Sequence, residues 1–253
     1  MKLFLLTLIC TACIMNGQAQ VVALDLDLSK PAKNRSMNGE DLLRQMHEKF
    51  RKGVCKAYTF SQKNTHYRND SITGHSEWHE AIEFPDKFRI DFGEKTAGNY
   101  VIFKADSAYS FKKNQLVKRR YDSNTLLLLL GGMYYRPIDE VITRLKNENY
   151  LTTMLSSQTW ENRPVYVVGA RTEDTLSNQI WIDKETLQVV RIIEKMNDTD
   201  TMDMRFESHV KMCKGFIENK VSFRRNGKLE QVEEYFDIQS VGAFPVSTFS
   251  IAQ

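Results

Sequence analysis

The sequence predicts a mainly β (α+β) domain, and three observations lead to this prediction. From residue 56 onward, apolar residues recur with a period of two in short runs that turn residues separate. Before that point, Leu42, Leu43, Met46 and Phe50 recur at helical spacing, and a second helical pattern interrupts the short runs after residue 125. We therefore expect about ten or eleven strands in an antiparallel meander, one N-terminal helix and one or two short helices in the middle.

Residues 1–19 have the three-part pattern of a secretory signal peptide. Lys2 supplies a positive charge before the apolar run Leu3 to Met15, and small residues stand at Gly17 and Ala19. A membrane-spanning helix needs roughly 20 apolar residues, and this run ends sooner. We therefore expect cleavage after Ala19 and export of the mature chain.

The rest of the chain divides into an extended leader at residues 20–35 and one domain at residues 36–253. The leader lacks periodicity and contains Pro31, whereas the domain has no linker or charge block within it. An alternative for the N-terminus is a lipoprotein signal that is cut before Cys13, which would then carry an acyl anchor. The expected location is the periplasm in either case, soluble in the first and lipid-anchored in the second.

The two helical patterns have recognisable ends. The first predicts a helix over Ser36 to Lys52, with Ser36 or Asn38 as its N-cap and Gly53 at its end. The second begins in the run Leu126 to Leu130 and continues after Pro137, a residue that is well tolerated at the start of a helix.

Turn residues divide the strand pattern. Thr73-Gly74, together with Asn69 to Ser71, predicts a turn before the strand that ends at Pro85. Later in the chain, Gly215 to Arg225 is expected to be one strand, which Asn226-Gly227 joins to the next strand in a hairpin.

Composition excludes some classes of function. The chain carries 35 basic and 32 acidic residues and a net charge of +3, so it lacks the strong basic excess of a nucleic-acid-binding protein. Two cysteines, Cys55 and Cys213, remain after the signal peptide. In an oxidising compartment they can form a disulfide, and they can equally be buried thiols. We expect a monomer.

No residue pattern predicts catalysis or a cofactor. The chain has no phosphate-binding glycine loop and no nucleophile elbow, so we assign no catalytic residue. His75, Glu77 and His79 would lie on one side of a strand, where they could approach a metal ion. No fourth ligand is evident, and polar residues that face solvent opposite Trp78 and Ile82 explain the same pattern. We therefore assign no metal site, and we expect a protein that is not an enzyme.

Aromatic and apolar residues recur on single faces of the predicted strands. A sheet with helices against one face encloses an apolar space, which binds a ligand such as an acyl chain if side chains leave it open. We expect these residues to line such a space: Phe60, Trp78, Ile82, Phe88, Ile90, Phe92, Phe103, Tyr109, Phe111, Trp181, Phe206 and Phe223.

Several segments together resemble the superfamily of the outer-membrane lipoprotein carrier (LolA-like), which also includes the lipoprotein receptor and a sigma-factor regulatory sensor. The first helix and the strand Ala57 to Gln62 are similar to the start of that fold. Gly74 to Trp78 and Phe84 to Asp91 resemble its glycine, tryptophan and Pro-x-x-Phe-Arg hairpin, and Gln179 to Asp183 resembles a later strand. The resemblance covers most of the mature chain.

The resemblance implies a fold and a function. Such proteins have an unclosed antiparallel β-barrel with helices across its concave face, where carriers hold acyl chains of lipoproteins between an inner-membrane ABC transporter and an outer-membrane receptor. The implied function here is a periplasmic carrier of lipid or lipoprotein. The alternative is an envelope regulatory sensor or protein-interaction module of the same fold. Classical carriers have an arginine latch at the position of Phe84, so this chain departs from them there.

Overall fold

The structure is a computed structural model that describes residues 36–174 and 176–251. The expected signal peptide at 1–19, the leader at 20–35 and the alternative anchor at Cys13 lie outside the described residues. The folded domain begins at Met37.

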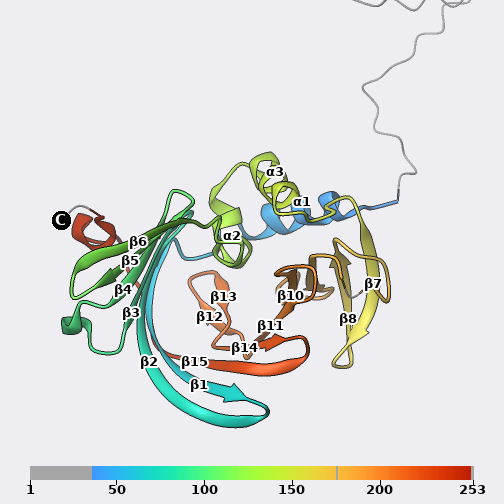
Figure 1. The fold of residues 1–253 in the computed structure, drawn as a ribbon. Coiled ribbons are helices and arrows are strands. Elements are labelled where there is room, and N and C mark those ends of the chain that lie inside the picture. The colour runs from blue at the N-terminus through green and yellow to red at the C-terminus, as the bar shows by residue number, and fades with distance from the viewer. Residues whose placement is uncertain (1–35, 175, 252–253) are drawn as a thin grey trace, which may run out of the picture. The chain divides into compact units, whose positions relative to one another are not determined.

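A single large antiparallel sheet of 13 strands forms the body of the domain. It curves into a cup that is not closed, with β6 and β7 at its two free edges (Figure 1). The strand order is β6-β5-β4-β3-β2-β1-β15-β14-β11-β10-β9-β8-β7. Strands β1 to β6 lead from the middle of the sheet to one edge, each paired with the next. Strand β7 lies at the other edge, and the strands that follow it lead back to the middle, where β15 pairs with β1. The expected unclosed mainly β fold is therefore confirmed.

The sheet is built from strands that differ widely in length. In chain order they are β1 (Ala57–Arg68), β2 (Ser71–Glu83), β3 (Lys87–Phe92), β4 (Tyr100–Lys104), β5 (Ser107–Lys112), β6 (Gln115–Tyr121), β7 (Leu155–Trp160), β8 (Arg163–Val168), β9 (Gln179–Asp183), β10 (Val189–Lys195), β11 (Thr201–Glu207), β14 (Lys220–Arg225) and β15 (Lys228–Ser240). A separate hairpin of β12 (Val210–Met212) and β13 (Gly215–Ile217) lies within the cup (Figure 1).

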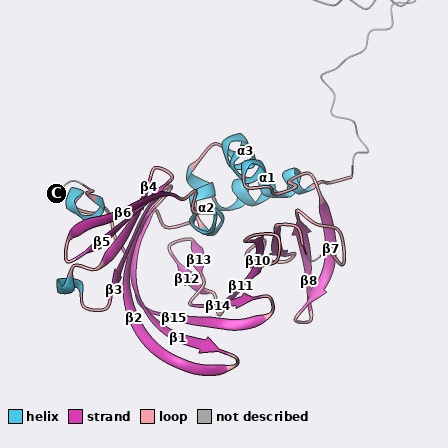
Figure 2. Cartoon of the chain, in the orientation of Figure 1, coloured by secondary structure: helices cyan, strands magenta, loops and turns pink. Residues whose placement is uncertain are grey.

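Three α-helices of the described domain lie across the open side of the cup (Figure 2). They are α1 (Gly39–Phe50), α2 (Thr125–Leu130) and α3 (Ile138–Asn147), and short 3₁₀ helices occur at η1 (Lys95–Ala97), η2 (Gly132–Tyr135) and η3 (Val246–Phe249). Asn38 caps α1 in a capping box: its side chain accepts a hydrogen bond from the Asp41 amide, and the Asp41 carboxylate accepts one from the Asn38 amide. The expected first helix is thus confirmed, with Asn38 as its cap.

The sequence prediction differs from the structure at several strands. The structure has 15 strands in its described part, whereas about ten or eleven were expected. The predicted strand Gly215 to Arg225 is two strands, β13 and β14. Thr73-Gly74 lies inside β2, because the positive φ angles that turn the chain here belong to Asn69 and Asp70.

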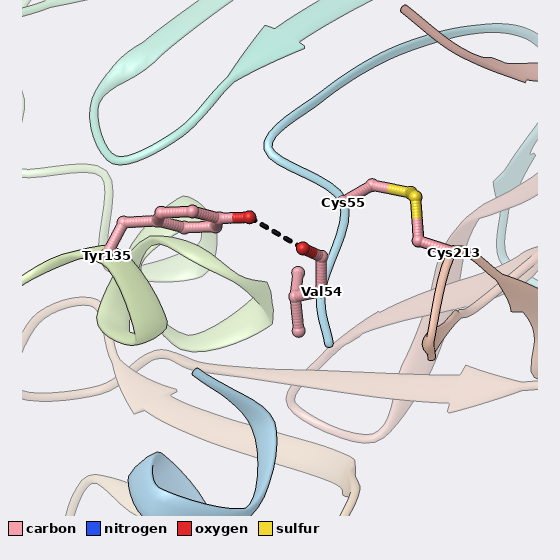
Figure 3. The surroundings of a disulfide bond; sticks show 4 residues. All are labelled: Val54, Cys55, Tyr135 and Cys213. Carbon is pink, nitrogen blue, oxygen red and sulfur yellow. Dashed lines mark hydrogen bonds between the residues drawn. A yellow bond between two sulfur atoms is a disulfide. The ribbon is translucent and has the colours of Figure 1, made fainter. Parts of the chain in front are cut away.

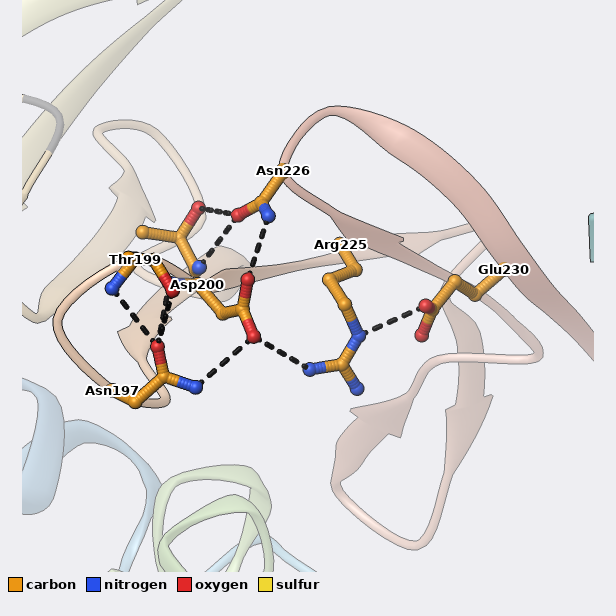
Figure 4. Close-up of polar contacts among 7 residues, drawn as sticks. Asn197, Thr199, Asp200, Arg225, Asn226 and Glu230 are labelled. Carbon is orange, nitrogen blue, oxygen red and sulfur yellow. Dashed lines mark hydrogen bonds and ion pairs between the residues drawn. The ribbon is translucent and has the colours of Figure 1, made fainter. Parts of the chain in front are cut away.

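Two hairpin turns at one rim of the cup hold each other in place. The β14–β15 turn uses Asn226 and Gly227, both at positive φ, as the sequence predicted. Asn226 Nδ2 donates to Asp200 in the β10–β11 turn at 2.9 Å, and Asn197 Nδ2 donates to the same carboxylate at 3.0 Å (Figure 4). Hydrogen bonds to one acidic side chain therefore fix both turns.

One half of the concave face is densely packed. Apolar residues of α1 and α3 pack there against the strands from β8 to β14, and these residues are fully buried: Leu42, Leu43, Met46, Val141, Leu145, Val168, Ile180, Ile182, Ile192, Phe206 and Val221. The helical spacing of the two α1 leucines and Met46 places all three side chains on the face toward the sheet. This packing is the main core of the domain.

The segment between α1 and β1 joins three parts of the molecule. Cys55 forms a disulfide with Cys213 in the β12–β13 turn, with 5.5 Å between the Cα atoms. Beside it, the hydroxyl of Tyr135 in η2 donates to the Val54 carbonyl at 2.6 Å (Figure 3). The sequence left the state of the two cysteines open, and in the structure they attach the interior hairpin to the first strand.

Replacing both cysteines by alanine should lower the free energy of unfolding by about 2–5 kcal/mol, because the bridge spans 158 residues of sequence. Urea titrations of the wild type with and without a reductant, and of the double variant, measure this. Equal unfolding midpoints in all three samples would contradict the prediction.

Gly131, between α2 and η2, lies directly against the ring of Phe84. A Cβ atom at Gly131 would lie 2.1 Å from that ring, whose side chain is fully buried. Gly131→Ala should therefore lower the free energy of unfolding by about 1–3 kcal/mol through overpacking. Gly74→Ala is the matched control, because nothing lies within 4 Å of the new methyl group there. A urea titration that gives the two variants equal stability would refute this packing account.

Candidate functional site

The other half of the concave face is not filled. A cavity of about 650 Å³ lies there between the sheet, the N-terminal end of α2 and the loops after α3 and β10. These residues line it: Phe88, Ile90, Phe103, Arg120, Asp122, Ser123, Asn124, Thr125, Leu126, Glu148, Asn149, Asn178, Glu194, Lys195, Met196 and Phe223. Its volume is more than ten times that of the cavity under α2 that adjoins it.

Strand register gives this cavity an apolar floor. Phe88 on β3 is paired with Phe103 on β4, and their rings stack with 5.5 Å between centroids. Ile90 follows two residues after Phe88, so it projects from the same face of the sheet. Phe223 on β14 lies on the same concave face, since it lines the cavity together with Phe88 and Ile90.

The opposite rim of the cavity is polar. Arg120 on β6 forms an ion pair with Asp122 at 2.7 Å, and its guanidinium lies 5.9 Å from the centre of the Phe103 ring. Glu194 on β10 accepts a hydrogen bond of 2.8 Å from the Tyr150 hydroxyl. Burial raises the pKa of Glu194 in spite of that hydrogen bond. An apolar floor beside a polar rim suits an amphiphilic ligand.

The structure brings most of the predicted lining residues onto the concave face. Phe88, Ile90, Phe103 and Phe223 line the large cavity. Phe60 and Ile82, on β1 and β2, line a smaller cavity beside it. Phe206 belongs to the packed core. Trp78 and Phe92 are cross-strand partners on the same face and pack edge to face at 5.1 Å.

Three of the predicted lining residues lie on the opposite, convex face, so they do not line the cavity. Tyr109 and Phe111 pack there with Ile102 and with Phe249 of η3. Trp181 packs with Val165 and neighbouring residues on the outside of β8 to β10. The prediction failed here because alternation within a strand gives two faces, and only the register with neighbouring strands decides which of them is concave.

The smaller cavity, of about 50 Å³, lies deeper under α2. Leu126, Leu127 and Leu130 of α2 form one side of it, and the sequence prediction did not assign these leucines to a site. Phe88, Asn124 and Leu126 line both cavities, so the two adjoin each other. Asn124 adopts positive φ, and its side chain caps α2 by accepting a hydrogen bond from the Leu127 amide.

Buried carboxyl groups surround the smaller cavity. Glu80 on β2 and Glu218 before β14 line it, and Glu233 on β15 lies close to both. Burial raises the pKa of Glu218 and of Glu233 to about 7. Burial also raises the pKa of Glu80 well above its ordinary range, and the charges of the other two glutamates raise it further. Hydrogen bonds from Tyr235, Gln231 and Gln62 oppose the shift at Glu233.

Charged side chains fasten the helix layer to the sheet. Arg144 of α3 contacts Asp106 in the β4–β5 turn at 2.7 Å, and Arg136 lies 3.6 Å from Asp86 in the β2–β3 turn. Phe84, at the position of the arginine latch in classical carriers, is buried between Tyr58 and Tyr135, with 5.9 Å between its ring centre and each of theirs. At this position the contact between the two layers is therefore apolar.

The histidine-rich segment of β2 makes ordinary polar contacts. His79 Nδ1 lies 2.9 Å from the Ser61 hydroxyl, and His75 Nδ1 lies 3.3 Å from the hydroxyl of Thr65. In the part of the chain that the structure describes, no group of three or more His, Cys, Asp or Glu residues is arranged to hold a metal ion. The helices among the same residues are all too short or too polar to cross a bilayer.

The pKa of Glu218 predicts how stability changes with pH. Its carboxyl has a pKa of about 7 in the folded protein against an ordinary value of 4.5, so the folded state keeps a proton that the unfolded chain loses between these values. Glu218 therefore lowers the free energy of unfolding as the pH rises through this interval. Between pH 5 and pH 8, the stability advantage of Glu218→Gln over the wild type should grow by about 1–3 kcal/mol.

Urea titrations at each pH measure this difference, in which the contributions of titrating groups that do not interact with Glu218 cancel, while the effect of its charge on Glu80 is included. Glu230→Gln on β15, where the glutamate is half-buried, paired with Arg225 and outside the carboxyl cluster, is the matched control and should run parallel to the wild type. A Glu218→Gln variant that also runs parallel to the wild type would show that this carboxyl is not held in its protonated form.

The fold has clear likenesses among solved structures, although no family model and no curated protein matches the sequence. A DUF1329 family protein from Desulfovibrio piger matches with a TM-score of 0.58 and 14% identity, over 84% of this chain and 96% of that one. A LolA superfamily protein from Nitrosomonas europaea matches with a TM-score of 0.56 and 11% identity, over 85% and 98%.

A third match is a structure from Vibrio parahaemolyticus that is described as a putative outer membrane lipoprotein-sorting protein domain. Its TM-score is 0.58 and its identity 10%, over 84% of this chain and 97% of that one. All three matches cover nearly the whole of the other chain, so the likeness extends over the whole domain. The chain therefore has the LolA-like fold in a divergent form.

Proposed function

We propose that this protein is a binding protein of the bacterial envelope that carries the apolar chain of a lipid or lipoprotein in the concave cavity. The observation that supports this most strongly is the open cavity of about 650 Å³ with Phe88, Ile90, Phe103 and Phe223 along its floor. Ligand sites in proteins have volumes of about 300–1,000 Å³, so the space suits one chain-bearing molecule. The proposal is binding and transfer, not catalysis.

The energetics of the floor support an apolar chain as ligand. Each methylene group that leaves water contributes roughly 0.8 kcal/mol, so a chain needs no polar contact to be held. Polar and charged groups lie along the rim, where the head group of an amphiphile can stay hydrated. Arg120 and Lys195 offer positive charges there, and Glu148 and Glu194 lie beside them.

Three further observations support an extracytoplasmic location. Disulfides such as Cys55–Cys213 form and persist in oxidising compartments, which include the bacterial periplasm. The sequence of residues 1–19 predicts export. The Vibrio structure with the same fold is described as a lipoprotein-sorting domain. We therefore place the transfer step in the periplasm, between an inner-membrane donor and an outer-membrane acceptor.

Ile90→Gln should weaken binding of a fluorescent fatty-acid probe by about three- to tenfold, because it puts a polar group into the cavity floor. Ile72→Gln is the matched control, since Ile72 on β2 is 58% exposed and away from the cavity. Probe titration of the wild type and both variants measures the effect. No binding by the wild type, or equal loss in both variants, would sink the proposal.

A further inference from the structure

The deepest part of the concave face is acidic, although apolar side chains surround it. Glu80, Glu218 and Glu233 come from three segments far apart in the sequence, and each is at most 7% exposed. Their charges act on one another: those of Glu233 and Glu218 raise the pKa of Glu80. Grouping three carboxyl groups in a water-poor interior is costly unless a proton or another positive charge accompanies them.

The smaller cavity gives these groups a common space. Its other walls are almost wholly aromatic and aliphatic: Tyr58, Phe60, Ile82, Phe84, Phe88, Leu126, Leu127, Leu130 and Tyr235. No lysine, arginine or histidine is among the described residues that line it. Its volume of about 50 Å³ holds a small polar group but not a chain. The adjoining large cavity, which shares Phe88 and Leu126, has the room for a chain.

Hydrogen-bond acceptors around this space lack donors. Within the described residues, the Glu80 carboxyl receives no hydrogen bond from another side chain, and that of Glu218 receives one only from its own backbone amide. Gln62 on β1 is 1% exposed, and its Oε1 atom has no partner. The Gln62 Nε2 atom donates a hydrogen bond to Asn64 Oδ1, and the Gln62 side chain also forms a hydrogen bond with Glu233. Gln62 is therefore connected to the carboxyl cluster through Glu233. Buried acceptors in native proteins almost always have a donor, so these point to a ligand that brings N–H groups.

We propose that the smaller cavity binds the ammonium group of a single-chain amphiphile, whose apolar chain runs along the floor of the large cavity. An ammonium group supplies both the positive charge and the hydrogen-bond donors that the Glu80 and Glu218 carboxyl groups at the cavity wall lack. The inference rests on the proposed function, because the chain occupies the carrier cavity. It adds to it the chemical class of the cargo: a chain that carries an amine.

Binding of such a group depends on pH through the groups that face the site. Tyr58, Glu80, Glu218 and Tyr235 line it, Glu233 lies behind them and acts on both glutamates through its charge, and α2 contributes no titratable group. His209 lines the neighbouring cavity on the far side of Glu218. An ammonium ion favours the ionised carboxylates, so it displaces their protons, and its affinity should rise from pH 6 to pH 8.

Three probes of equal chain length test the inference: decylamine, 1-decanol and decanoate. Decylamine stays charged at both pH values, since alkyl ammonium groups lose their proton near pH 10.4. At pH 8 the wild type should bind decylamine at least about tenfold more tightly than 1-decanol, which is about 1.4 kcal/mol. The ratio should fall at pH 6. Calorimetry at pH 7 in buffers of different ionisation enthalpy should show that protons are released when decylamine binds, but not when 1-decanol or decanoate binds.

The double variant Glu80→Gln/Glu218→Gln should lose both the preference for the amine and its dependence on pH. Glu83→Gln is the matched control, because Glu83 lies on the same strand as Glu80 but lines neither cavity and is paired with Lys87. It should keep the preference. A preference that persists in the double variant, or that vanishes equally in the control, would overturn the assignment.

The outcomes separate this inference from the proposed function. If no probe binds the wild type, the carrier function itself is wrong. If all three probes bind equally and no proton is released, the carrier function stands and the ammonium site is wrong. The proton-release measurement uses the wild type only, so it decides the matter even if the double variant does not fold.

Discussion

The structure depends on how the apolar concave face of an unclosed sheet is kept from water. In the described domain, three short α-helices have to cover thirteen curved strands, and they do so unevenly. The helices α1 and α3 seal the half formed by β8 to β14 with the main core. Over β3 and β4 only the start of α2 is present, so Phe88 and Phe103 face an open space. The carrier function that we propose uses the half that the helices leave uncovered.

The same constraint explains how the helix layer is attached. A rigid, fully apolar contact between helices and sheet would close the cavity, whereas a polar contact alone would hold the layers weakly. The chain combines both. Phe84 is buried against Gly131 at the end of α2, while Arg136 and Arg144 reach carboxylates in turns of the sheet. The disulfide at Cys55 fixes the interior hairpin, which carries the chain on to Glu218 at the cavity wall.

Local periodicity predicted the antiparallel strands and the first helix, and the resemblance to the LolA-like superfamily implied that the sheet is not closed. Phe88 and Ile90 belong to one alternating strand, so the pattern alone placed them on one face of the sheet. Strand β7, Leu-Ser-Ser-Gln-Thr-Trp, has few apolar residues, as is usual at a sheet edge, and such strands are one reason why fewer strands were expected than the structure has. Tyr109 and Trp181 were assigned to the wrong face because register between strands is a long-range property. The carboxyl cluster was invisible for the same reason: Glu80 and Glu233 meet only through the pairing of β1 with β2 and with β15.

The most direct test of the account is native mass spectrometry of the mature protein, isolated without detergent from the envelope of cells that produce it. The account predicts a fraction whose mass exceeds that of the polypeptide by one chain-bearing molecule, which organic extraction removes and vesicles of the same lipids restore. Protein that leaves the envelope with no bound amphiphile, and that takes none up from vesicles, would contradict it.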